Sequence, residues 1–368
     1  MIWKIPLSKP DVKESDKKEV LKVLKTPYLS LGPKLAEFEK AIAKFAGVKY
    51  ALGVSSGTAG LHLIIRALGI GRNDEVITTP FSFISSANCF VYEGARPVFV
   101  DIDEKTLNID VGKIEEKITA RTKAILAVDV FGQPADWPRL EAIAKKHKLF
   151  LVEDSAEALG SVCQGKKCGS FGDAAIFSFY PNKQISTGEG GMILTDKKEI
   201  ADFCRSSTNQ GRRSAGPQWL EHVRLGYNYR LDEMSAALGL SQLKRIEAVI
   251  RQREKIADLY NKKLNKTAGI EVFKVGSGVS RFVYIVKLAQ GLNRDKIISE
   301  LAKKGIQCSN YFQPIHLQPF YQKEFGFKAG LFPIAEDAGR RTLALPFFNN
   351  LSEKEIDFVV SCLKKIIR

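Results

Sequence analysis

The sequence lacks the long apolar segments of membrane and exported proteins. None of its apolar runs approaches the roughly 18 residues that a membrane-spanning helix needs. The first residues, MIWKIPLSKPDVKESDKK, contain no apolar core of the kind found in a secretory signal peptide. We therefore expect a cytoplasmic protein that has no membrane partner.

Cysteine and histidine are few, and neither has the spacing of a metal site. The six cysteines form no CxxC pair, and the four histidines form no HxxxH or similar set. Thiols of a cytoplasmic protein stay reduced and are usually buried as small apolar groups. We expect neither a metal site nor a disulfide framework.

The motifs of nucleic-acid binding are missing as well, although the chain carries a net charge of +15. It has no RGG run, no zinc-finger spacing and no basic strand interleaved with aromatic residues. In LKRIEAVIRQREKIADLYNKKL the charges fall at helical spacing between apolar residues, which indicates the solvated face of a helix. A basic surface is favoured over nucleic-acid binding, and such a surface also suits small anionic substrates.

Strands and helices alternate over most of the length. Apolar runs predict strands at 75–80, 97–102, 123–130, 148–154, 174–180, 191–196 and 282–289. Helical periodicity predicts helices at 35–47, 58–68, 138–148, 294–305 and 352–368. This alternation indicates an α/β fold with a mostly parallel sheet and helices on both of its faces.

The length of 368 residues predicts two domains, because a domain typically has roughly 150 residues. A long helix from about Ser235 is expected to lead the chain out of the sheet. We place a large domain at 26–245 and a smaller α/β C-terminal domain at 246–368. The segment 1–25 is expected to pack with the smaller domain.

Two glycine-rich segments resemble phosphate-binding loops but depart from them. The run GSVCQGKK (160–167) ends in lysine where a Walker A motif needs serine or threonine for Mg²⁺. The run GEGG (188–191) lacks the later glycine and the following helix of a dinucleotide-binding fingerprint. We interpret both as turns.

The segment VSSGTAGLHLIIRAL (54–68) has two readings. Small residues precede an apolar helix that starts near Thr58, so free backbone N–H groups and the positive end of the helix dipole point at one spot. Such a helix start binds phosphate well. A plain serine or threonine N-cap explains the same residues equally well.

Two ionisable residues follow predicted strands. Asp154 ends an apolar strand, and ligands of open α/β sheets bind at such carboxyl ends, although a helix cap or a turn aspartate is the alternative. Lys183 follows the next strand in a turn rich in glycine, serine and threonine. A lysine is normally a solvated surface charge, but one held there could lose solvation and become a nucleophilic amine.

Together these features resemble the pyridoxal 5′-phosphate (PLP) enzymes of fold type I, and most closely the DegT/DnrJ/EryC1/StrS sugar aminotransferases. The resemblance runs from Pro27 to the C-terminus. Its matching stretches are SSGTAGLHL, PFSFISSANCFVYEGARPVFVDID, FGQPADW, VEDSAEALGS, GSFGDAAIFSFYPNKQISTGEGGMILTD, GYNYRLDEMSAALGLSQL and PIHLQPFY. The resemblance implies a large PLP-binding domain with a smaller C-terminal domain, and PLP as cofactor.

The resemblance also implies roles for individual residues in binding the cofactor. Lys183 would form the internal aldimine and later shuttle a proton, and Asp154 would pair with the pyridinium nitrogen. The remaining implied cofactor-binding residues are Gly57, Thr58, Ala59 and Ser178 at the phosphate, Phe83 over the ring, Glu157, and Asn228 at the phosphate of a partner subunit.

The implied reaction is transamination of a sugar. Some relatives are dehydratases with histidine at the position of Lys183, so the lysine favours transamination. Tyr311 and His316 lie in the segment that resembles the sugar-nucleotide contact region, although a structural histidine explains His316 equally well. Many members have glutamine or histidine where this chain has Glu157, and glutamate there resembles the perosamine-synthase branch.

These features imply a homodimeric enzyme that transfers an amino group, with L-glutamate as donor, to a nucleotide-linked keto-sugar. The expected sugar is a 4-keto-6-deoxyhexose used in cell-surface polysaccharide or glycoconjugate synthesis. One alternative is a PLP aminotransferase acting on a C3-keto sugar or a cyclitol. Another is a catalytically silent PLP-fold regulator, against which the presence of Lys183 and Asp154 argues.

Overall fold

A computed structural model describes residues 3–213, 220–273, 275–276 and 278–367. The helices are α1 (Glu14–Val23), α2 (Pro33–Ala46), α3 (Gly57–Ala67), α4 (Ser85–Val91), α5 (Trp137–His147), α6 (Lys198–Thr208), α7 (Glu233–Leu243), α8 (Ile246–Leu264), α9 (Arg294–Lys303), α10 (Pro319–Phe325), α11 (Pro333–Arg341) and α12 (Glu353–Ile367). Short 3₁₀ turns lie at Val111–Lys113, Glu115–Lys117, Val130–Gly132 and Ile315–Leu317.

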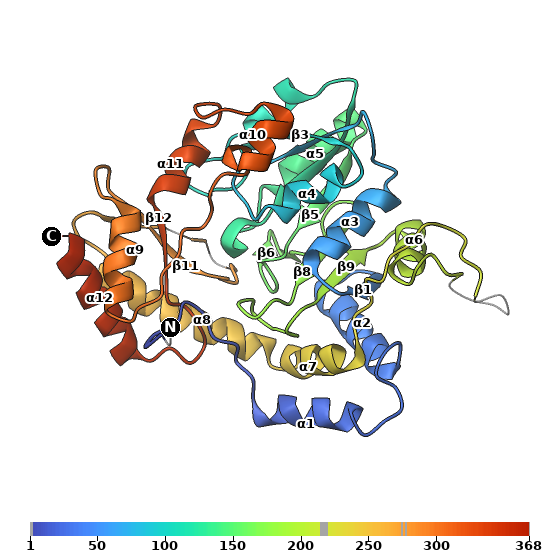
Figure 1. Cartoon of the computed structure of the whole chain (residues 1–368), viewed down its shortest axis with the longest axis horizontal. Coiled ribbons are helices and arrows are strands. Elements are labelled where there is room, and N and C mark those ends of the chain that lie inside the picture. The colour runs from blue at the N-terminus through green and yellow to red at the C-terminus, as the bar shows by residue number, and fades with distance from the viewer. Residues whose placement is uncertain (1–2, 214–219, 274, 277, 368) are drawn as a thin grey trace.

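The strands form two main sheets and one small hairpin (Figure 1). The large sheet has the order β1-β9-β8-β5-β4-β2-β3, the C-terminal sheet the order β10-β11-β12, and β6 pairs with β7. The strands are β1 (Tyr50–Val54), β2 (Glu75–Thr78), β3 (Arg96–Phe99), β4 (Thr122–Val128), β5 (Phe150–Asp154), β6 (Val162–Cys163), β7 (Lys166–Lys167), β8 (Ala174–Ser178), β9 (Gly191–Thr195), β10 (Ile270–Val272), β11 (Tyr284–Leu288) and β12 (Thr342–Leu345).

The large sheet is mostly parallel, which confirms the predicted fold class. Strands β3, β2, β4, β5 and β8 pair in parallel, while β9 runs antiparallel to both of its neighbours, β8 and β1. The carboxyl ends of β4, β5 and β8 therefore meet at one edge of the sheet. That edge is where ligands of α/β sheets bind.

Different helices cover the two faces of this sheet. Ile176 of β8 and Ile193 of β9 belong to the apolar cluster that includes α3. Phe177 and Met192, the next residues along the same strands, belong to the cluster that includes α2. Because side chains alternate along a strand, each strand contributes to both apolar layers. The sheet is thus buried on both sides, as parallel sheets are.

The C-terminal sheet is antiparallel and has its own apolar cluster, built with α8, α9 and α12. The single long helix predicted from about Ser235 is instead two helices, α7 and α8, which are separated at Lys244 and Arg245. In Figure 1 these two helices connect the part that holds the large sheet to the part that holds the small one. Periodicity alone missed the break because both helices are apolar on their buried side.

The N-terminal segment contacts both parts of the molecule. Ile5 pairs with Ile306, and the backbone N–H of Leu7 donates to the side chain of Gln307, so these residues pack with the C-terminal part. Helix α1 packs against α7 instead, and lies below it in Figure 1. Of the segment 1–25 that was expected to pack with the small domain, residues 1 and 2 lie outside the described part of the chain, residues 5–7 contact the C-terminal part, and α1 contacts α7.

The glycine-rich segments are turns, as predicted. The segment 160–167 forms the β6–β7 hairpin, and 188–190 is the turn that enters β9. All six cysteines are free thiols. Among the described residues, no helix is both long and apolar enough to cross a membrane.

Candidate active site

A cavity of about 440 Å³ opens at the carboxyl ends of β4, β5 and β8. The first turn of α3 forms one wall, and Phe282, Tyr311 and Phe312 from the C-terminal part of the chain form another. The cavity thus lies where the two parts of the chain meet. The residues that line it include seven that were predicted from the sequence: Gly57, Thr58, Phe83, Asp154, Glu157, Ser178 and Lys183.

Lys183 lies on the loop between β8 and β9, and its side chain is 11% exposed. Its Nζ atom is 3.6 Å from Oε1 of Glu157 and 4.0 Å from the ring centroid of Phe282. Burial lowers the pKa of the Lys183 amine, and the neighbouring carboxylates of Glu157 and Asp154 only partly oppose this shift. The lower pKa increases the fraction of the nucleophilic, uncharged amine.

Asp154 is the last residue of β5 and is 4% exposed. The hydroxyl of Ser86 donates to its Oδ2 at 2.6 Å, and the backbone N–H of Ala156 donates to its Oδ1 at 3.2 Å. Burial raises the pKa of this carboxyl, while the Ser86 hydrogen bond works in the opposite direction. A buried carboxylate of this kind is stabilised when a cation lies beside it.

Glu153 and Ser155, the neighbours of Asp154 in the chain, form hydrogen bonds on the opposite face of the sheet and so hold the end of β5 in place. The hydroxyl of Ser155 lies 2.5 Å from Oδ2 of Asp129 and 2.6 Å from Oε1 of Glu153. Glu153 also accepts hydrogen bonds from the backbone N–H groups of Gly169 and Phe171. Because successive side chains of a strand point in opposite directions, this anchoring turns Asp154 toward the cavity.

Glu157 lies beside Lys183 and is almost fully buried. Its Oε2 accepts a hydrogen bond of 2.8 Å from the backbone N–H of Phe131, and its Oε1 faces Lys183. Burial raises the pKa of Glu157, and the positive charge of Lys183 partly opposes this shift. The pKa values of both partners are therefore shifted toward their uncharged forms.

The start of α3 and the end of β8 form a narrow, polar edge of the cavity. A Cβ atom added to Gly57 would lie 3.3 Å from Cβ and 3.6 Å from Oγ of Ser178, so glycine leaves the space beside the hydroxyl open. Ser56 caps the helix by accepting a hydrogen bond from the backbone N–H of Ala59 at 3.1 Å. The helix is therefore capped, and its first turn also faces the cavity, where phosphate binding by Gly57 and Thr58 stays a prediction. Ala59 itself is engaged in the cap.

Aromatic residues line the rest of the cavity. Phe83 is 59% exposed at the mouth, where its ring is free to cover a flat ligand. Tyr311 packs against Phe282 and Phe131, with ring centroids 6.0 and 6.5 Å away. Burial raises the pKa of the Tyr311 hydroxyl, so this group remains a hydrogen-bond donor at neutral pH.

His316 does not line the cavity. It is fully buried, its Nε2 lies 3.1 Å from Oε1 of Glu336, and its ring packs edge-on against Phe332. Burial lowers the pKa of His316, although Glu336 opposes the shift. Of the two interpretations of His316, the geometry favours the structural histidine.

Asn228 also lies outside the cavity of its own chain. It is exposed and forms an isolated antiparallel bridge with Asn209. The sequence expectation assigns it to the cofactor of a partner subunit, so an outward position does not conflict with that expectation.

Several residues that shape the site were not predicted from the sequence. Ser86 donates to Asp154 and is paired with Ser82, whose Oγ is 2.9 Å away. Ser82 lies before α4 and Ser86 in its first turn, so helical spacing does not predict their contact. Phe282 lies over Lys183, and nothing in the sequence around it predicts that contact because the two residues are 99 positions apart.

The residues present fit PLP, the cofactor implied by the sequence. Lys183 supplies an amine, and the buried Asp154 suits a protonated ring nitrogen. Gly57 leaves space next to the Ser178 hydroxyl at a helix start, which suits a phosphate. The exposed ring of Phe83 suits stacking on a heteroaromatic ring.

Comparison with known proteins agrees with this fit. The model of the DegT/DnrJ/EryC1/StrS aminotransferase family matches residues 10–364. GDP-perosamine synthase of Caulobacter vibrioides is 39% identical over 371 residues, which cover 99% of this chain and 98% of the relative.

Two solved structures are similar over almost their whole length. Helicobacter pylori PseC, an aminotransferase of pseudaminic acid biosynthesis, has a TM-score of 0.93 and 33% identity, with 98% of each chain covered. The PLP form of Spr1654 from Streptococcus pneumoniae has a TM-score of 0.93 and 29% identity, again with 98% of each chain covered.

Proposed function

The chain belongs to the DegT/DnrJ/EryC1/StrS aminotransferase family, and we propose that it transfers the amino group of L-glutamate to a keto-sugar carried on a nucleotide. It is a PLP-dependent sugar aminotransferase. The single observation that carries the proposal is the placement of two buried ionisable groups, Lys183 and Asp154, in one cavity.

The chain's own residues would divide the work of the reaction. When bound, PLP supplies a carbonyl group that combines with amines and a ring that accepts electrons as a proton leaves the substrate. The amine of Lys183 would bind the cofactor and later move the proton at its Nζ atom. Asp154 would hold the ring nitrogen in its protonated form, and Ser86 would orient that carboxylate.

Other residues would bind and orient. The first turn of α3 at Gly57 and Thr58 and the hydroxyl of Ser178 would hold the phosphate, with Phe83 over the ring. Glu157 would tune the protonation of Lys183, whose Nζ atom lies 3.6 Å from it. Tyr311 would donate a hydrogen bond to the sugar substrate from the opposite wall.

We propose a nucleotide-linked 4-keto-6-deoxyhexose as the acceptor. A GDP-perosamine synthase is 39% identical, and Glu157 resembles that branch of the family. The net charge of +15 suits a substrate with a diphosphate, because basic residues attract and orient anionic groups. The reaction would be ping-pong, with glutamate leaving its amine before the keto-sugar binds.

We further propose that the active unit is a homodimer and that the large domain spans 26–245. Asn228 of one subunit would then contact the phosphate in the partner's cavity. Its exposed position, outside the cavity of its own chain, supports this arrangement.

The test begins with the cofactor. Borohydride reduction of the PLP-loaded protein and peptide mapping should place the label on Lys183. The purified protein is then mixed with glutamate and with 4-keto-6-deoxy sugars linked to GDP, UDP or dTDP, and products are identified by mass and NMR. Lys183→Ala is the control for enzyme-independent amination.

The outcomes separate the parts of the proposal. Amination of one sugar nucleotide supports the substrate class. Amination of a free cyclitol ketone or a 2-oxo acid, with none of the sugar nucleotides, would overturn that class and leave the PLP chemistry intact. Label on a different lysine would overturn the role of Lys183.

A further inference from the structure

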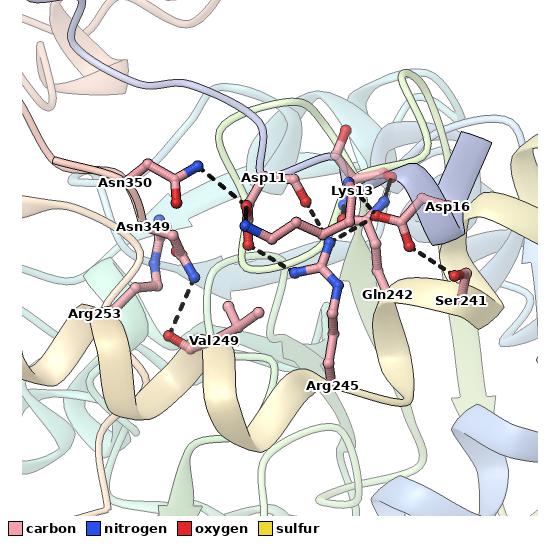
Figure 2. Close-up of polar contacts among 11 residues, drawn as sticks. Asp11, Lys13, Asp16, Ser241, Gln242, Arg245, Val249, Arg253, Asn349 and Asn350 are labelled. Atoms are coloured by element: carbon pink, nitrogen blue, oxygen red, sulfur yellow. Dashed lines mark hydrogen bonds and ion pairs between the residues drawn. The ribbon is translucent and has the colours of Figure 1, made fainter. Parts of the chain in front are cut away.

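Helix α8 carries a buried arginine that reaches the loop of Lys183. Arg253 is 4% exposed, and Figure 2 shows it on α8 beside Asn349. Its Nη1 donates to Oδ1 of Asn349 at 3.0 Å, and its Nε donates to the carbonyl of Arg281 at 3.0 Å. Its Cζ atom also lies 5.0 Å from the ring centroid of Phe347.

The remaining nitrogen of the guanidinium binds two carbonyls next to the reactive lysine. Nη2 donates to the carbonyl of Asn182 at 3.3 Å and to the carbonyl of Phe282 at 2.9 Å. Asn182 precedes Lys183 in the chain, and Phe282 carries the ring against which the Lys183 amine packs. One side chain therefore joins the backbone from which the lysine extends to the backbone of its packing partner.

Arg253 is charged although the acceptors that the described residues offer it are neutral. They are three backbone carbonyls and one amide oxygen. Burial lowers the pKa of Arg253 to about 10, which still leaves it protonated at neutral pH. A buried charge costs free energy unless hydrogen bonds satisfy it. The guanidinium of Arg253 donates to four acceptors here, and an apolar side chain would leave all four without this donor.

We propose that Arg253 is a positioning residue for Lys183, holding the lysine loop and the Phe282 segment at the distance that keeps the amine buried in the cavity. The proposal rests on the proposed role of Lys183. Its physical basis is that a guanidinium donates in a rigid planar fork, whereas a lysine ammonium cannot reproduce all four hydrogen bonds at these positions. Two glutamines also hold the loop. Gln242 bonds Ser186, while Gln184 donates to the carbonyls of Glu157 and Ser280, so it joins the loop to a point two residues before Phe282, and Arg253 alone among the three reaches the carbonyl of Phe282 itself.

The chain offers a matched control on the same helix. Arg245, the N-cap of α8, binds Asp11 and Asp16 of the N-terminal segment, as Figure 2 shows. It is also a partly buried arginine with several acceptors, but these hydrogen bonds go to Asp11 and Asp16 and none to the loop of Lys183. Arg245→Lys therefore tests the loss of an arginine fork without a change at the site.

The experiment compares wild type, Arg253→Lys, Asn349→Ala and Arg245→Lys. The first readout uses the apoprotein, in which the rate of covalent capture of PLP is followed against pH. Only the uncharged amine reacts, so the midpoint reports the pKa of Lys183. The second readout is the kcat and the KM for L-glutamate of the loaded enzyme, and the third is the thermal unfolding temperature.

We expect Arg253→Lys to raise the capture midpoint by about half a pH unit or more, because a looser loop admits water and relieves the desolvation of Lys183. Its kcat should fall about tenfold or more, since a small displacement of a reacting group is costly. Its KM should stay within about threefold of wild type, because the substrate contacts remain. Asn349→Ala should shift the midpoint in the same direction by less.

Arg245→Lys should lower the unfolding temperature and leave the capture midpoint unchanged. Wild-type midpoints in both Arg253→Lys and Asn349→Ala would overturn the proposal, and if Arg253→Lys does not fold, Asn349→Ala decides alone. Capture of PLP by wild type on a lysine other than Lys183 would instead overturn the proposed role of Lys183, and this inference with it.

Discussion

Burial shifts the pKa values of Lys183, Glu157 and Asp154, and in each case it favours the uncharged form. The lysine is then a better nucleophile, while the two carboxyls are stabilised as anions by their hydrogen bonds and by a neighbouring cation. The protonation states of these three residues are therefore coupled to the occupant of the cavity.

Replacing Asp154 with asparagine should slow turnover by more than tenfold. A charged hydrogen bond is worth about 1.5–3 kcal/mol, and about 1.4 kcal/mol corresponds to tenfold in rate. The unfolding temperature of the apoprotein should not fall, because asparagine removes a carboxyl whose charged form burial disfavours. Steady-state kinetics and thermal unfolding test the two expectations, and unchanged turnover would refute the role of Asp154.

Replacing Glu157 with glutamine should lower the pKa of Lys183. The carboxylate of Glu157 raises that pKa, so removing its charge leaves the desolvation of the amine less opposed. The pH midpoint for capture of PLP by the apoprotein should move down. Glu189→Gln removes the same charge from an exposed position on the cavity lining, where water screens it, and should move the midpoint less. An upward shift in Glu157→Gln contradicts the electrostatic account.

Sequence patterns identified the residues whose position follows from local rules. Asp154 and Lys183 each follow an apolar strand of the sheet, and strand ends of an α/β sheet converge, so their meeting was predictable. Contacts that bring distant segments together were not predictable, as for Phe282 over Lys183. The sequence around a histidine among apolar residues is compatible with a binding site or with the core, and the contact with Glu336, which favours the core for His316, is not visible in it.

At the scale of elements, the start of α3 combines a capped helix with an open edge of the cavity. Gly57→Ala should weaken PLP binding by about tenfold or more, because the added methyl group crowds Ser178, where a displacement of even 1 Å is costly. The apoprotein should be as stable as wild type or more so, since alanine is the better helix former.

Equilibrium binding of PLP, measured by absorbance, and thermal unfolding test this expectation. Gly71→Ala is the control, because its new Cβ would have only an ordinary contact of 3.6 Å with the carbonyl of Glu93. Equal affinity of Gly57→Ala and wild type would show that the phosphate binds elsewhere.

Helices and strands with a clear hydrophobic periodicity were predicted from the sequence. Those whose ends or pairing depend on contacts with other elements were not. The apolar runs at 174–180 and 191–196 correspond to β8 and β9, but their antiparallel pairing depends on the lysine loop between them. Strand β1 was missed because its residues, YALGV, are few and continue directly into the small residues before α3. The break between α7 and α8 does not interrupt the hydrophobic periodicity of the sequence, so it was not predicted either.

At the scale of the whole molecule, a site completed by a second subunit should show complementation. Lys183→Ala and Asn228→Ala should each be poorly active alone. Their mixture, after dissociation and reassembly, should recover part of the activity, because one site of a mixed dimer has neither lesion. A mixture of Lys183→Ala with Asp154→Asn is the control and should stay inactive, since both residues line the same cavity. A fully active monomer in sedimentation would contradict the dimer.

The contacts of α1 also determine when this helix can dock during synthesis of the chain. Asp16 is fully buried, yet its partners Ser241 and Arg245 lie 225 and 229 residues further along the chain. At about 5–20 residues per second, the ribosome needs about 10–45 s to reach them. Every strand of the large sheet is translated within that delay, so α1 waits undocked while the sheet assembles. In ribosome-bound chains of stepped length, protease cleavage within 14–23 should persist until Arg245 has emerged, and earlier protection would contradict this order.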